Sequence, residues 1–277
     1  MTQNGDFLRL GSANGEFSCE EFHEMSDELI KAHLNLYAVL RNLEDIVEYD
    51  RETASLVMDW DVSVQFSVLK GPRAYIEFRG GVCTVGRGKY DNPSVRLLFL
   101  SPAHLNRMID GRGNPIPIKG FTRLGFLKRD FTRVTERLEY YLKPTAELLK
   151  DEEYLALNTR LTLHTAAFAV REIGLLDPVG RLLASHIGNG SVNLKILPHG
   201  PGVCVNFKDG DIEPRKGEAD RPMAVMWMKN VKAAHDFLSG KTDAFTAIAS
   251  GDVMIRGQIP MLESLSLILD RIPHYLS

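Results

Sequence analysis

The sequence lacks the features that mark most secreted, membrane-spanning and nucleic-acid-binding proteins. It has 3 cysteines (Cys19, Cys83 and Cys204) in 277 residues and no Cys-x-x-Cys pair, which argues against a disulfide framework. No apolar run approaches the roughly 18 residues that a membrane helix needs, and the N-terminal residues have no signal-peptide pattern. The formal net charge of -3 gives no reason to expect a nucleic-acid partner. We therefore expect a soluble cytoplasmic protein with no transmembrane segment.

Strong catalytic motifs are also absent from the sequence. There is no Gly-x-Ser-x-Gly elbow, no Walker loop, no His-Glu-x-x-His and no dinucleotide fingerprint. Gly86-Arg-Gly88 is a short glycine pair, which is more typical of a turn than of a phosphate cradle. We expect no cofactor, and we interpret the chain as a non-enzymatic protein.

Three weaker candidates for chemistry have ordinary structural explanations. Cys19 and His23 lie one helical turn apart, but acidic neighbours at a helix start are normal capping chemistry, so we expect no metal. His164 lies among leucines, where a histidine is more often packed than catalytic. Asp59 and Asp61 flank the entry to a strand, which explains them better than acid–base work does.

What is present is a regular succession of helical and alternating segments. Strands with one covered face are predicted from alternating apolar residues, and helices from apolar residues at three- and four-residue spacing. The predicted helices cover residues 18–59, 101–111, 131–141, 155–176, 179–187, 230–240, 243–249 and 260–272. The predicted strands cover residues 62–68, 74–78, 82–85, 95–99, 120–126, 192–196, 203–207, 223–228 and 253–255.

The order of these segments occurs twice, and the two copies stay in register. Gly71, Phe78, Gly81, Pro93 and Gly111 each have an identical residue 129 positions later in the chain. The closing helices both end in Tyr-Leu, at Tyr141 and at Tyr275. An internal repeat explains this better than two unrelated α+β halves do.

The stretch 238–257 contains a helix ending at Gly240-Lys241, a short helix containing Ala247, and then Gly251-x-Val-x-Ile-x-Gly257. This order of elements resembles the sterol carrier protein-2 (nonspecific lipid-transfer) family. The resemblance implies an α+β fold of two tandem sterol-carrier-like repeats, each a mainly antiparallel five-stranded sheet covered by helices. It also implies an apolar tunnel that holds acyl chains, sterols or other lipids.

The repeats divide the chain into an N-terminal arm (1–15), a first repeat with leading helices (16–145) and a second repeat with leading helices (146–277). The first repeat departs from the family pattern after Gly111, where Pro115 and Pro117 disfavour the short helix that forms part of the tunnel. The second repeat is therefore the better candidate for a ligand site.

From this resemblance we predict binding or carriage of a hydrophobic ligand without catalysis, and two sets of side chains are candidates to line its tunnel. The set in the second repeat is Ile196, Phe207, Val225, Trp227, Phe237, Phe245, Ile248 and Met254, and the set in the first is Phe66, Phe78, Leu97 and Leu105. The alternative for all of them is a filled core, in which case the protein is an interaction module that binds a protein partner. An enzyme acting on a lipid-like substrate is a third reading, but no nucleophile–base pair supports it.

Overall fold

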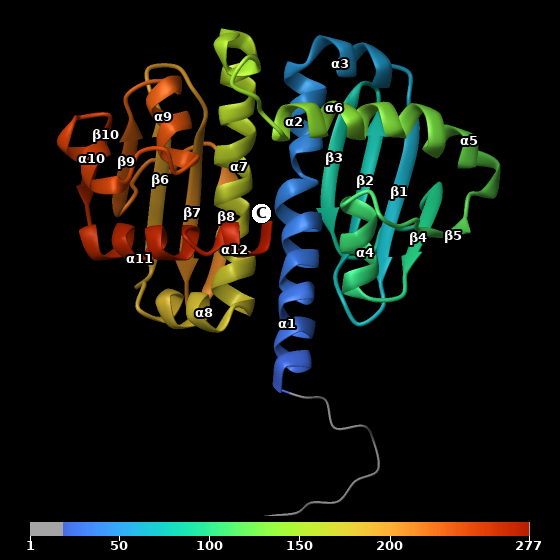
Figure 1. The fold of residues 1–277 in the computed structure, drawn as a ribbon, viewed down its shortest axis with the longest axis horizontal. Helices are drawn as coiled ribbons and strands as arrows, with labels where there is room; N and C mark the ends of the chain where they lie inside the picture. The colour runs from blue at the N-terminus through green and yellow to red at the C-terminus, as the bar shows by residue number, and fades with distance from the viewer. Residues whose placement is uncertain (1–18, 277) are drawn as a thin grey trace, which may run out of the picture.

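The computed structural model describes residues 19–276, in which two β-sheets lie on either side of a pair of long helices (Figure 1). The predicted N-terminal arm, 1–15, and the side chains of Cys19 and His23 lie outside what the structure describes. None of the described helices is both long and apolar enough to cross a bilayer.

The first half begins with helices and closes with a helix after its sheet. Its helices are α1 (Cys19–Leu34), the π-helical turn Asn35–Val39, α2 (Asn42–Tyr49), α3 (Arg51–Val57), α4 (Pro102–Ile109), α5 (Leu124–Phe126) and α6 (Thr132–Leu142). Its strands are β1 (Asp61–Val68), β2 (Arg73–Arg79), β3 (Val82–Arg87), β4 (Val95–Phe99) and β5 (Ile116–Lys119).

The second half repeats this order. Its helices are α7 (Glu152–Leu176), α8 (Pro178–Ser185), α9 (Val231–Leu238), α10 (Ala244–Ala249), α11 (Ile259–Leu269) and α12 (Ile272–Leu276). Its strands are β6 (Gly190–Ile196), β7 (Gly202–Lys208), β8 (Asp211–Lys216), β9 (Ala224–Met228) and β10 (Val253–Gly257).

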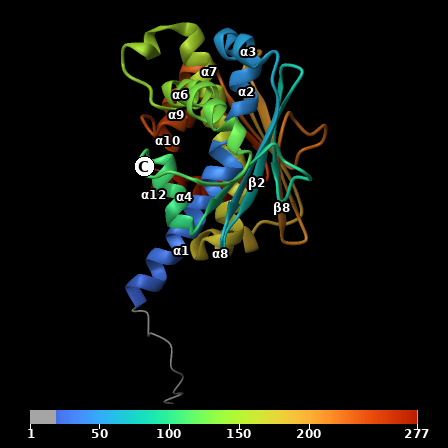
Figure 2. The same cartoon turned by 90° about the vertical axis from the view of Figure 1, so that its right-hand side faces the viewer.

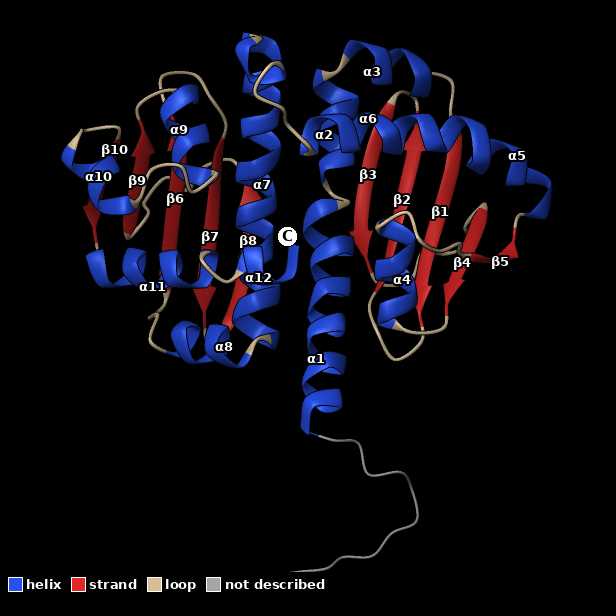
Figure 3. Ribbon diagram, viewed as in Figure 1, coloured by secondary structure: helices blue, strands red, loops and turns tan. Residues whose placement is uncertain are grey.

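The two sheets share one topology, which confirms the predicted fold class. The strand orders are β3-β2-β1-β4-β5 and β10-β9-β6-β7-β8. In each sheet a single pair is parallel, β1 with β4 and β6 with β9, and the other pairs are antiparallel. Each sheet is therefore mixed but mainly antiparallel (Figure 3).

The strand predicted over 120–126 is wrong. The last strand of the first sheet is β5, Ile116–Lys119, and residues 121–126 are helical. Gly120 has a φ of +85°, which turns the chain at the end of β5. Pro117 is tolerated because β5 is an edge strand, where a missing backbone N–H leaves no neighbour unpaired.

Helices cover one face of each sheet and leave the other face open, as Figure 2 shows. In β1, Val62, Val64 and Phe66 are buried beneath the helices, while Ser63 and Gln65 point to the opposite face. The same alternation gives β9 an inward set of Ala224, Met226 and Met228 and an outward, half-buried set of Val225 and Trp227.

The leading helices of the two halves pack against each other and enter each other's cores. α1 and α7 run in opposite directions through the middle of the molecule (Figure 1). Ile30, Leu34 and Ala38 belong to the core of the second half, whereas Leu157 and Leu161 of α7 belong to the core of the first. Such interpenetration is typical of an obligate interface, so neither half has a complete core without the other.

Reciprocal ionic contacts cross this interface twice. Glu172 of α7 contacts Arg87 at the end of β3, and its Oε2 lies 3.0 Å from His33 Nδ1. In the opposite direction, Asp45 of α2 lies 2.8 Å from Lys216 Nζ and 2.9 Å from His164 Nδ1. The two clusters are related by the approximate twofold symmetry of the repeats, as residues in an isologous dimer interface are.

Within each half an aspartate joins the start of a short helix to the closing helix. Asp50 caps α3 by accepting from the Thr53 N–H at 3.0 Å, and Asp177 caps α8 by accepting from the Gly180 N–H at 2.6 Å. Asp50 also binds Arg137 and the Tyr141 hydroxyl, whose oxygen lies 2.9 Å away.

Asp177 makes the same set of contacts in the second half. It binds Arg271, and the Tyr275 hydroxyl donates to it at 2.6 Å. Burial opposes ionisation of Asp177, yet the bonds from Arg271 and Tyr275 outweigh it and hold its pKa below the usual value.

Candidate functional site

The segment on which the family resemblance depends forms a short two-turn helix, α10, on the covered side of the second sheet. Asp243 caps it, accepting from the Thr246 N–H at 3.0 Å and from the Thr246 hydroxyl at 2.6 Å. These hydrogen bonds hold the pKa of Asp243 below its usual value. Gly240 and Gly251, with φ values of +72° and +75°, reverse the chain on either side. The helix is therefore a separate unit bounded by two glycines in the left-handed conformation.

α10 presents its two largest apolar side chains to solvent. Ala247 is buried in the core of the second half, but Phe245 is 89% exposed and Ile248 is 42% exposed. Full burial of a phenylalanine stabilises a protein by roughly 1.5–3 kcal/mol, a contribution that Phe245 does not make in this conformation. An apolar surface at this position is available to a ligand or partner instead.

The predicted lining residues lie in three different environments. Six are buried in the two cores, namely Phe66, Phe78, Leu97 and Leu105 in the first half and Ile196 and Phe207 in the second. Val225, Trp227 and Phe237 are half-buried. Phe245, Ile248 and Met254 are exposed.

The alternation of side chains along the strands places these residues on two different faces of the second sheet. Trp227 pairs with Met254 of the edge strand β10, and both lie on the open face of the sheet, away from Phe207 and the helices. Phe207 lines a cavity of about 370 Å³ beside α8, and Ile196 lines one of about 730 Å³ at the junction of the halves. The role of the twelve residues as ligand contacts stays a prediction.

The first half has no counterpart of α10. After Gly111, whose φ is +73°, residues 112–115 run without helix directly into β5. This agrees with the expectation that Pro115 and Pro117 disfavour a helix there. The second half alone therefore carries the apolar helix.

His164, which was considered for chemistry from the sequence, and a second histidine, His235, are both held in structural contacts. His164 is buried and contacts the Asp45 carboxylate, a partner that is distant in sequence. His235 is also buried, and its Nδ1 lies 3.2 Å from Asn158 Oδ1. Burial and then the nearby Lys241 ammonium lower the pKa of His235, which favours the neutral ring. Asp59 is exposed in the turn before β1. Within the described residues, no group of three or more histidine, cysteine or acidic side chains could hold a metal ion.

Several of the solved structures that match this chain share one description. They are named as sterol carrier protein domains. The sterol carrier protein domain 2 of Helicoverpa armigera is 17% identical, covering 42% of this chain and 91% of its own, with a TM-score of 0.33. A palmitated sterol carrier protein 2-like 2 structure from Aedes aegypti is 14% identical, covering 41% and 94%, with a TM-score of 0.30.

A UbiJ-SCP2 ubiquinone synthesis protein is 12% identical, covering 34% of this chain and 80% of its own, with a TM-score of 0.28. The family that the sequence pattern resembles is the one that these solved structures carry in their names. Neither a family model nor a curated relative matches the sequence.

Proposed function

We propose that the protein binds and carries a hydrophobic ligand, such as a fatty acyl, sterol or isoprenoid-like chain, in the second half beneath α10, without catalysing a reaction. The observation that carries this proposal is the exposure of Phe245 and Ile248 on a capped helix framed by Gly240 and Gly251. This helix would act as a cover that turns at its two glycines. The sterol carrier names of similar folds point to the same class of ligand.

The core beneath α10 is suited to being opened by a flexible chain. Met226, Met228 and Met261 belong to it, and methionine side chains repack easily because they are unbranched and polarisable. When α10 moves, an apolar chain takes the place of solvent against these side chains. Each methylene transferred from water contributes roughly 0.8 kcal/mol, so a long chain binds without many polar contacts.

Native mass spectrometry of the freshly purified protein, followed by extraction of any bound molecule, tests this proposal. A bound lipid near one per chain is expected, together with uptake of a fluorescent fatty acid by delipidated protein. The variants Phe245→Ser and Ile248→Ser should reduce uptake, because a turn of the cover at its two glycines would bring these side chains against the ligand. Phe121→Ser is the matched control, since Phe121 is 63% exposed in the first half, which has no such helix.

An empty protein that takes up neither fatty acids nor isoprenoids would overturn the proposal. The same exposed side chains would then mark the protein-interaction module considered from the sequence.

A further inference from the structure

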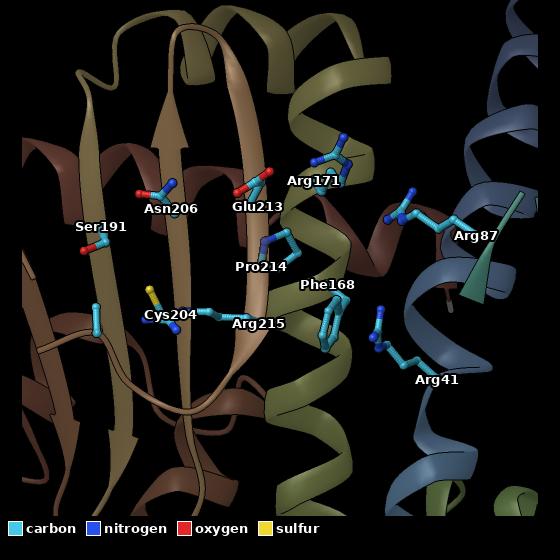
Figure 4. A pocket seen from close by; sticks show the side chains of 11 residues that line it. Arg41, Arg87, Phe168, Arg171, Ser191, Cys204, Asn206, Glu213, Pro214 and Arg215 are labelled. Atoms are coloured by element: carbon cyan, nitrogen blue, oxygen red, sulfur yellow. The ribbon is translucent and has the colours of Figure 1, made fainter. Parts of the chain in front are cut away.

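A groove of about 700 Å³ lies on the open face of the second sheet, beside α7 and next to the first half (Figure 4). Four arginines from four different elements line it, namely Arg41 before α2, Arg87 of β3, Arg171 of α7 and Arg215 of β8. Buried Phe168 and Cys204 contribute apolar atoms to its wall. The groove is thus on the side of the sheet opposite to the helices and distinct from the site beneath α10.

The corresponding surface of the first half is filled by two tyrosine rings. Tyr75 and Gly86 form a cross-strand pair of β2 and β3, and the Tyr75 ring lies over Gly86, where an added Cβ would come 2.1 Å from it. Tyr90, whose N–H donates to the buried Gln65 side chain, packs against Tyr75 with ring centroids 4.8 Å apart. The Tyr75 ring therefore occupies the space over Gly86.

In the second half, different residues occupy the positions of Tyr75, Gly86 and Tyr90. Strand register places Cys204 and Arg215 in the position of the Tyr75 and Gly86 pair. Ala219, whose N–H donates to Asn193, stands in the position of Tyr90. Two rings have become a thiol and a methyl group, and a glycine has become an arginine. The groove is therefore a specific departure from the internal repeat.

The charges of the groove are only partly neutralised within the chain. Arg87 contacts Glu172, and Arg171 lies 3.0 Å from Asp211, which is itself half-exposed. Arg215 donates to the Glu218 carbonyl at 3.3 Å and, among the described residues, has no carboxylate within ion-pair distance.

Arg41 is held mainly by stacking. The Arg41 guanidinium lies 4.4 Å from the centre of the Phe168 ring. The Arg41 Nε lies 3.5 Å from the Glu44 carboxylate and, among the described residues, has no hydrogen-bond partner. Among the residues that the structure describes, Glu213 is the single carboxylate in the wall. The terminal groups of Arg41 and Arg215 are thus the cations with the weakest ionic pairing in the groove.

We propose that this groove binds the phosphate group of a small ligand. Guanidinium groups bind phosphate oxygens in a planar, bidentate manner, and several arginines suit a phosphate, which offers more acceptor oxygens and more charge than one carboxylate. This site goes beyond the proposed carriage of an apolar ligand and uses none of its residues.

Titration calorimetry with inorganic pyrophosphate at low ionic strength tests the site for a soluble phosphate. Sedimentation with phosphatidylcholine vesicles containing phosphatidic acid tests it for a lipid headgroup. Either probe should bind wild-type protein, with an affinity that falls as sodium chloride is added. Arg215→Ala and Arg41→Gln should each weaken binding at least tenfold. Arg112→Ala is the control, because Arg112 is 72% exposed and remote from the groove in the first half.

A triple variant, Cys204→Tyr, Ala219→Tyr and Arg215→Gly, copies the filled surface of the first half and should abolish binding. Its fatty-acid uptake should persist, which separates this site from the one beneath α10 and shows that the variant is folded. The proposal would be overturned if the wild-type protein bound neither pyrophosphate nor the phosphatidic acid vesicles. It would also be overturned if Arg215→Ala and Arg112→Ala bound a probe equally well.

Discussion

His33 and His164 make the same kind of contact from opposite halves, and each places Nδ1 within 3.0 Å of a carboxylate that belongs to the other half. The acceptors are Glu172 and Asp45, and each also meets a basic side chain from the end of an edge strand. Burial opposes ionisation of both acids, but hydrogen bonds and nearby positive charges outweigh it and lower the pKa of each. The interface therefore depends on two ionised acids.

We predict that stability falls in acid through these two groups. A carboxyl whose pKa is lower in the folded state contributes stability above its unfolded pKa, about 4, and loses it as the pH falls below that value. Urea unfolding between pH 7 and pH 3 should show this loss, and Asp45→Asn should show a shallower dependence on pH. At pH 7 the free energy of unfolding of this variant should be lower by about 3 kcal/mol. This is the lower end of the range for breaking a buried ion pair, and we take the lower end because Lys216 is partly exposed.

Asp59→Asn is the control for this experiment, because Asp59 is exposed and lies outside the interface. An unchanged pH profile in Asp45→Asn would show that the interface acids do not govern acid stability.

We predict equal effects of Tyr141→Phe and Tyr275→Phe. Each removes the hydrogen bond that the hydroxyl donates to a helix-capping aspartate, Asp50 or Asp177, and a bond to a charged group is worth about 1.5–3 kcal/mol. The longer bond of 3.3 Å that the Tyr141 hydroxyl accepts from Arg137 adds little to this difference. The free energy of unfolding, measured with urea at pH 7, should fall by that amount in both variants. Tyr140→Phe serves as the control, since Tyr140 is exposed. A large effect in one variant and none in the other would mean that the two networks are not equivalent.

We predict that Gly251→Ala destabilises the protein through backbone conformation alone. No atom lies within 4 Å of an added Cβ, but the φ of +75° is unfavourable for alanine and costs about 1 kcal/mol. Gly188→Ala is the matched control, because its site is equally open and its φ is not in the left-handed region. Thermal unfolding should place the first variant below wild type and the second at or above it. A neutral Gly251→Ala would show that the end of α10 adjusts freely.

The strands and the repeat were predictable because they depend on local alternation and on turn residues. The paired Tyr141 and Tyr275 were visible in the sequence, but their acceptors, Asp50 and Asp177, were not, because 91 and 98 residues separate each tyrosine from its aspartate. His164 was correctly expected to be packed. Its orienting partner, Asp45, comes from the other half, so only the packing of α7 against α2 reveals it.

The candidate site was predicted less well than the fold. Apolar character identifies residues that avoid water but does not say which face of a strand they occupy, so Trp227 was grouped with Phe207 although they lie on opposite faces. The exposure of Ile248 was not predictable, because Ile248 fits the same helical pattern as the buried Ala247, whereas Phe245 lies two residues from Ala247 and therefore on another face of the helix. The groove was not predicted, because its four arginines are spread over residues 41–215 and form no sequence motif. A comparison of Tyr75 and Tyr90 with their counterparts 129 positions later would have indicated it.

The covalent link between the halves has a consequence that an ordinary dimer does not share. Two identical subunits assemble only above a threshold concentration, and every change in one is imposed on the other. In this chain, assembly is an intramolecular event, so the central interface persists at any dilution. Each copy is also free to change alone. The second copy bears the apolar helix, and its open face forms the arginine groove together with Arg41 and Arg87 of the first copy.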